Sequence, residues 1–141
     1  MRTLKIDEGV KEEIYLDHLG YPTFGIGHLI IESDPEHGME VGTEVSQERV
    51  IEAFDVDCET MVKECEILFE DDWNTFPGEV HEVLVNMMFN MGRTRLSKFK
   101  NFKKALVAHE WTKSATEGRD SLWHKQVPNR AERLMVRLES I

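Results

Sequence analysis

From residue 46 onward, the apolar positions of the chain recur at the spacing of an α-helix. Ser46 is a favourable N-cap residue, because its side-chain oxygen can accept a hydrogen bond from a free backbone N–H of the first turn. After it, apolar side chains repeat at helical intervals as far as residue 69, at Val50, Phe54, Met61, Cys65 and Leu68. The pattern predicts one helix of more than about 20 residues. Residues 71–78, which include Pro77 and Gly78, are expected to interrupt it.

A second run, residues 79–91, is apolar on nearly every side. Such a helix must be buried all round, so it is predicted to be the core helix, and Gly92 is expected to end it. Shorter helices are predicted over about 98–109, 111–118 and 129–138, with Pro128 at or just before the start of the last.

The N-terminal part of the chain has a different pattern. Residues 2–8 predict a short helix that ends near Glu8, because Gly9 follows. Residues 14–31 are β-branched, aromatic or aliphatic with interspersed glycine and proline, which predicts a hairpin or a small three-stranded sheet. Residues 32–45 are acidic and predict a surface loop. One helix, a small sheet and then many helices indicate an α+β fold that is mostly helical.

Length and composition are those of a single globular domain over residues 1–141. Hydrophobic residues make up 40% of the chain and charged residues 31%. No stretch approaches the roughly 20 apolar residues of a membrane span. The first residues contain no apolar h-region, so no signal peptide is expected and synthesis in the cytoplasm is predicted.

The net charge of −10 is unevenly distributed. Residues 1–80 carry 5 basic and 21 acidic side chains, whereas residues 81–141 carry 12 basic and 6 acidic ones. Either these are two ordinary solvated surfaces, or the basic part meets an anionic polymer.

Cys58 and Cys65 lie seven positions apart within the predicted long helix. Their Cα atoms would be about 10 Å apart, which is beyond the reach of a disulfide. They are interpreted as two small buried apolar side chains, and this use of cysteine suggests synthesis of the protein in a reducing compartment.

Two groups of residues are candidates for chemistry. Glu8 and Asp17 are carboxylates at the end of the predicted first helix and in the hairpin region, and glycoside hydrolysis requires such a pair. From spacing alone, two solvated carboxylates are the favoured interpretation. His28 is either a base or ligand, or a structural histidine paired with a carboxylate. The segment 25–28 lacks the rest of a dinucleotide-binding motif, and the histidines show no metal-ligand spacing.

Residues 93–104 form the densest basic stretch and include two phenylalanines. One interpretation is a solvated helix whose Leu96, Phe99 and Phe102 turn inward. The alternatives are contact with an anionic polymer and, less favoured, binding of nucleic acid.

Several motifs together resemble the T-even phage lysozymes, glycoside hydrolase family 24. These motifs occur in the family's order and cover essentially the whole chain: Ile6-Asp7-Glu8-Gly9, Ile14-Tyr15-Leu16-Asp17, residues 20–28 (GYPTFGIGH), residues 86–92 (NMMFNMG) and residues 121–133 (SLWHKQVPNRAER).

The resemblance implies a two-lobed fold and a set of residue roles. The lobes would be a small β-containing lobe over about 9–50 and a helical lobe over about 51–141, with helix 1–8 at their junction and the substrate cleft between them. Glu8 matches the general acid, Asp17 the second carboxylate and Thr23 the residue that helps to hold the attacking water. The other implied roles are a structural histidine, His28, paired with Asp57 (alternatively Asp55); Arg130 bracing Glu8; and substrate contacts from Leu29, Phe89, Asn90 and Met91.

The same resemblance implies a muramidase. It would hydrolyse the β-1,4 bond between N-acetylmuramic acid and N-acetylglucosamine in peptidoglycan with inversion, leaving about 6.5–9.5 Å between the two carboxyl groups. No cofactor, metal, nucleic-acid partner or membrane span is implied, and a monomer is expected. The enzyme would act on the cell wall in the periplasm, outside the cell or within a phage tail. The rival hypothesis is a catalytically weak wall-binding or virion structural module of the same fold.

Overall fold

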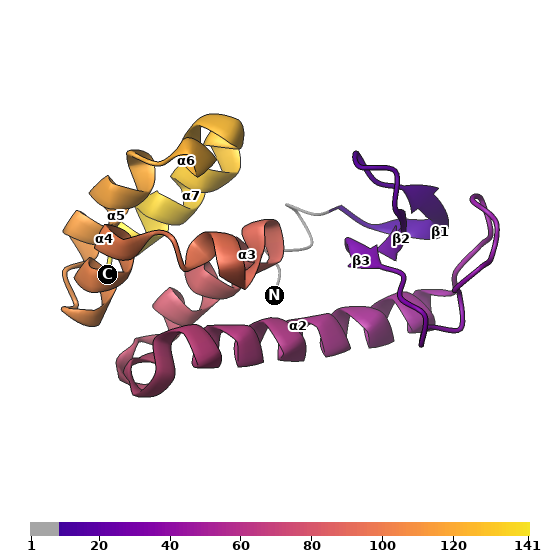
Figure 1. Cartoon of the computed structure of the whole chain (residues 1–141), viewed down its shortest axis with the longest axis horizontal. Coiled ribbons are helices and arrows are strands. Elements are labelled where there is room, and N and C mark those ends of the chain that lie inside the picture. The colour runs from indigo at the N-terminus through magenta and orange to yellow at the C-terminus, as the bar shows by residue number, and fades with distance from the viewer. Residues whose placement is uncertain (1–8) are drawn as a thin grey trace. The chain divides into compact units, whose positions relative to one another are not determined.

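The computed structural model describes residues 9–141, so the predicted helix over residues 2–8 lies outside the described residues. The chain divides into two compact units, Met1–Thr60 and Met61–Ile141. The division falls within one long helix, after residue 60 rather than near residue 50. Figure 1 shows the small sheet of the first unit and the helices of the second.

The first unit is built on a three-stranded antiparallel sheet, as residues 14–31 predicted. Its strands are β1 (Lys11–Leu16), β2 (Pro22–Gly25) and β3 (His28–Leu29), in the order β1-β2-β3. Residues 32–45 form turns, and their last part follows the outer edge of β1, where Ile14 N donates to Thr43 O at 2.9 Å and Val45 N donates to Glu12 O at 2.9 Å. The predicted loop therefore also covers the backbone edge of β1 that would otherwise be open.

Helix α2 (Gln47–Phe69) begins where the sequence predicted. The Arg49 N–H donates to Ser46 Oγ at 3.2 Å, which is the expected N-cap hydrogen bond. One face of its first turns packs on the sheet and buries apolar side chains from both elements: Ile14, Phe24, Ile26, Val50, Ala53 and Phe54. Gly25 has φ +66°, and a Cβ there would lie 3.1 Å from Val50 Cγ1, so a glycine permits both the turn and this close approach.

The second unit is helical. After α2 come the 3₁₀ segment η1 (Glu70–Thr75) and the helices α3 (Gly78–Leu96), α4 (Lys100–Val107), α5 (Trp111–Arg119), α6 (Leu122–Gln126) and α7 (Pro128–Glu139). Helix α3 is the buried core helix as predicted, and its backbone leaves the helical conformation at Gly92 (φ 78°, ψ 165°) before one further turn. The sequence did not predict η1 or α6, because both are too short to show a period.

The apolar side chains of the basic stretch, residues 93–104, turn inward as the first interpretation expected. Leu96 and Phe102 are buried, and Phe99 is half-buried with its ring centroid 6.5 Å from that of Trp123. Both phenylalanines are therefore used in packing within the second unit. Contact of the surrounding lysines with an anionic polymer stays a prediction.

Cys65 is fully buried, and this burial raises the pKa of its thiol to about 12. A thiol so far from ionisation is unreactive at neutral pH. The prediction of a small buried side chain is confirmed for Cys65, whereas Cys58 is only half-buried.

Gly118 lies in α5 at a close contact between α5 and α7. A Cβ at this position would overlap Sδ of the fully buried Met135. Gly118→Ala is therefore expected to lower the free energy of unfolding by about 1–2 kcal/mol, because the forced repacking outweighs the roughly 1 kcal/mol that alanine gains over glycine in a helix. Urea unfolding of a double-mutant cycle checks this, since in a Met135→Ala background the same substitution should stabilise the protein. Equal effects in the two backgrounds would contradict the overlap.

Candidate functional site

The turn after β1 fixes the Asp17 carboxylate through the backbone. Asp17 Oδ1 accepts hydrogen bonds from the N–H groups of Leu19 and Tyr21, each at 2.9 Å. Gly20, at φ +85°, provides the left-handed residue that closes the turn. Among residues 9–141, no group hydrogen-bonds Oδ2. Asp17 thus has one oxygen held in place and a second one available as an acceptor.

Thr23 lies in the middle of the sheet. It pairs with Tyr15 on β1 and Leu29 on β3, so the three residues form one row across the sheet. Thr23 is almost completely buried, whereas Leu29 is 49% exposed. The Thr23 hydroxyl donates to the carbonyl oxygen of Tyr21 at 2.9 Å. Since its single proton is used in this bond, Oγ1 can only accept from a further partner.

Tyr21 connects these two predicted site residues. Its N–H binds the Asp17 carboxylate, and its C=O binds the Thr23 hydroxyl. The sequence analysis did not identify this role. The available signal was the spacing of Asp17 and Gly20, which is typical of a turn in which an aspartate caps its own backbone.

His28 is buried between two carboxylates. Its Nδ1 lies 2.7 Å from Asp57 Oδ2, and its Nε2 lies 2.8 Å from Asp34 Oδ2. Burial disfavours the charged imidazole, but the hydrogen bonds and charges of both carboxylates outweigh it, so the pKa of His28 is raised. The expected contact with Asp57 is present. The alternative partner, Asp55, is exposed, and the sequence gave no sign of Asp34, because its position depends on the fold of the 31–34 turn.

In the second unit, Phe89, Asn90 and Met91 are half-buried at the end of the regular part of α3. Trp123 Nε1 donates to Asn90 Oδ1 at 2.7 Å, which leaves the Asn90 amide N–H groups as donors for another partner. Arg130 Nε donates to Oδ1 of the fully buried Asn86 at 2.9 Å. The expected contact of Arg130 with Glu8 lies outside the described residues, as does Glu8 itself.

Comparison with known proteins identifies the family. Residues 5–138 match the family model described as phage lysozyme. The chain belongs to the phage lysozyme family. The match covers nearly the whole chain, and the small N-terminal sheet followed by helices is consistent with this fold.

The chain is also similar in sequence to three known proteins. It is 31% identical to the pre-baseplate central spike protein Gp5 of Enterobacteria phage T4 over 94% of this chain but only 26% of that protein. It is 31% and 30% identical to the probable T4-type lysozymes 2 and 1 of Dictyostelium discoideum, over 97% of this chain and 91% of each relative. Family and relatives together support a lysozyme activity, that of a glycoside hydrolase.

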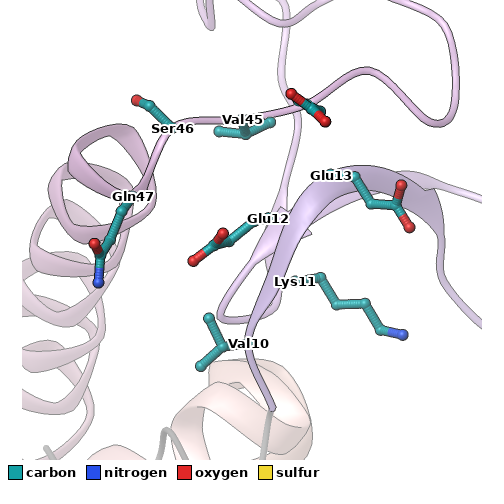
Figure 2. A pocket seen from close by; sticks show the side chains of 8 residues that line it. Val10, Lys11, Glu12, Glu13, Val45, Ser46 and Gln47 are labelled. Carbon is teal, nitrogen blue, oxygen red and sulfur yellow. The ribbon is translucent and has the colours of Figure 1, made fainter.

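A hollow in the first unit lies away from the residues expected to carry phage lysozyme chemistry. It has a volume of about 770 Å³ and is lined by residues 10–13 and 44–47. Figure 2 shows the Glu12 side chain reaching from β1 toward the start of α2, while Lys11 and Glu13 extend to the other side. None of Asp17, Thr23 and Leu29 lines it. The hollow and the Asp17 turn are therefore separate features of the first unit.

Two further observations concern residues 9–141. No group of three or more histidine, cysteine, aspartate or glutamate side chains there is arranged to hold a metal ion. In the same range, no helix has both the length and the apolar surface needed to cross a lipid bilayer.

Proposed function

We propose that this chain is a muramidase that hydrolyses the β-1,4 bond between N-acetylmuramic acid and N-acetylglucosamine in peptidoglycan. The observation that carries the proposal is the Asp17 carboxylate, which the backbone holds by one oxygen, together with a Thr23 hydroxyl that can only accept. Tyr21 binds both groups, and the chain belongs to the phage lysozyme family. It would act on the cell wall, either as a free enzyme or within a phage tail.

The proposed reaction uses two carboxyl groups and one water. Glu8 gives its proton to the leaving glycosidic oxygen as the bond to the anomeric carbon breaks. Asp17 Oδ2 takes a proton from the attacking water, whose oxygen forms the new bond to that carbon. The second water proton points at Thr23 Oγ1, because this oxygen is available only as an acceptor. The reaction inverts the anomeric configuration, since Asp17 acts through water.

Other residues are proposed to bind the glycan or to support the catalytic groups. Leu29 offers exposed apolar surface in the same row as Thr23. Asn90 offers its amide N–H groups, which suit the carbonyl oxygens of acetamido substituents. Phe89 and Met91 flank it. Arg130, oriented by Asn86, is proposed to brace Glu8. His28, Asp57 and Asp34 support the sheet and carry no chemistry.

Product analysis tests this proposal. Purified peptidoglycan incubated with the protein should release reducing ends that carry N-acetylmuramic acid, and the first product seen by NMR should be the α anomer. A β anomer would contradict inversion while leaving the lysozyme activity intact. Binding to the wall with no reducing ends would contradict the enzyme and favour a wall-binding or virion structural module.

A further inference from the structure

Three segments of the first unit meet at one imidazole. His28 is on β3, Asp34 is in the turn that follows it, and Asp57 is on α2. Each ring nitrogen lies within 2.8 Å of a carboxylate oxygen. An imidazolium donates from both nitrogens, whereas a neutral imidazole donates from only one and turns a lone pair toward its other neighbour. Both contacts can therefore exist together only while His28 is charged.

The two carboxylates are held very differently. Asp34 Oδ2 also accepts the Ile31 N–H at 2.9 Å, and its Oδ1 lies 3.2 Å from a guanidinium nitrogen of Arg49. Arg49 is itself fixed by Glu36, at 2.8 and 3.0 Å, and by Glu52 at 3.0 Å.

Asp57 has a single partner in the described part of the chain, His28. Its side chain is 22% exposed, against 13% for Asp34. The uncharged ring of Phe24 also lies against the imidazole, with the two ring centroids 4.9 Å apart.

We propose that His28 is a one-proton switch that releases Asp57 of α2 when it loses its proton and keeps its bond to Asp34. Releasing Asp57 is the less costly change, because its carboxylate can rotate into water and leaves no other group unpaired. Releasing Asp34 would disturb the Ile31 N–H and the Arg49 charge as well. The neutral imidazole therefore carries its proton on Nε2.

The position of this switch on the pH scale follows from its surroundings. Burial opposes the charge on His28, but the bonds to the two carboxylates more than compensate, so its pKa is raised above the ordinary histidine value. The arrangement in which His28 contacts both Asp34 and Asp57 is expected in acidic to neutral solution. Release of Asp57 is expected in alkaline solution. The link between Asp34 and Arg49 then remains as the polar connection between this turn and α2.

Nitrogen-15 NMR of the labelled full-length chain tests the switch. Both His28 ring nitrogens should be protonated at low pH, and the neutral form should be protonated at Nε2. The side-chain resonances of Asp57, but not those of Asp34, should shift with the same midpoint. A neutral form protonated at Nδ1, or an Asp57 side chain that does not respond, would overturn the proposal.

Three variants make the test specific. Asp34→Asn should move the proton of the neutral form to Nδ1, since Asp57 is then the only charged acceptor. Asp57→Asn should lower the midpoint of His28 and leave the proton on Nε2. Asp55→Asn is the matched control on the same helix and should behave as wild type. If the first two variants do not fold, the wild-type tautomer alone decides the question.

Discussion

Asp17→Asn is expected to reduce peptidoglycan hydrolysis by about 10²–10⁴-fold, the range typical of losing a general base. The substitution removes the charge but keeps the shape of the turn. An asparagine oxygen can accept the N–H groups of Leu19 and Tyr21 as Oδ1 of Asp17 does now. The free energy of unfolding should therefore change by less than about 1 kcal/mol. The loss of rate then reports chemistry and not misfolding.

Glu8→Gln is expected to cause a loss in the same range, because an amide of the same size cannot protonate the leaving oxygen. Initial rates of reducing-end release, together with urea unfolding of each variant, check both expectations. Asp55→Asn, an exposed aspartate outside the proposed site, is the control and should retain the wild-type rate. If either site variant kept more than roughly 1% of that rate, its residue would not have the proposed role.

His28→Asn is expected to lower the free energy of unfolding by about 3–5 kcal/mol in mildly acidic solution, the usual consequence of removing one partner of a buried ionic cluster. Two carboxylates would remain, Asp34 and Asp57, with no cation between them. For a domain of this size, such a loss corresponds to a fall in Tm of roughly 10 °C or more.

The pH dependence of this loss has a defined sign. The pKa of His28 is raised in the folded state. Its contribution to the free energy of unfolding is therefore complete below the unfolded pKa of 6.5 and disappears as pH rises through the folded pKa. The pKa of Asp34 is lowered: burial opposes this, but the Ile31 N–H, His28 and Arg49 outweigh it. The contribution of Asp34 to the free energy of unfolding is present above its unfolded pKa and is lost as pH falls through its folded pKa.

The difference in free energy of unfolding between wild type and His28→Asn should therefore be largest between about pH 4 and 6.5 and should shrink in alkaline solution. Thermal unfolding of both proteins across pH 3–10 would measure it. A constant difference over the whole range would show that the imidazole acts through packing alone.

Periodic elements could be predicted from the sequence. Helix α2 has a capping serine and a regular apolar face, and α3 is apolar nearly throughout. The resemblance to the lysozymes added the expectation that His28 contacts Asp57, and the structure confirms this contact. The catalytic roles of Glu8, Asp17 and Thr23 remain predictions.

What could not be predicted depends on turns. Asp34 reaches His28 because the 31–34 turn folds back through the Asp34 N–H bond to Ile31 O at 3.0 Å. Tyr21 supports Asp17 and Thr23 through its main chain, which no side-chain pattern records. Tyr21 acts through its peptide group, and the Asp34 carboxylate is positioned by a backbone bond of its turn. An analysis of residue types does not detect either kind of contribution.

The backbone hydrogen bonds of Tyr21 also determine which substitutions position 21 can accept. Its N–H binds the Asp17 carboxylate and its C=O binds the Thr23 hydroxyl, while its side chain is 55% exposed. Any residue other than proline that keeps the backbone conformation at this position has the N–H and C=O needed to hold the proposed catalytic carboxylate and hydroxyl. Position 21 is thus open to sequence drift and to directed evolution, so the surface beside Asp17 can be redesigned for a different wall chemistry without dismantling the turn.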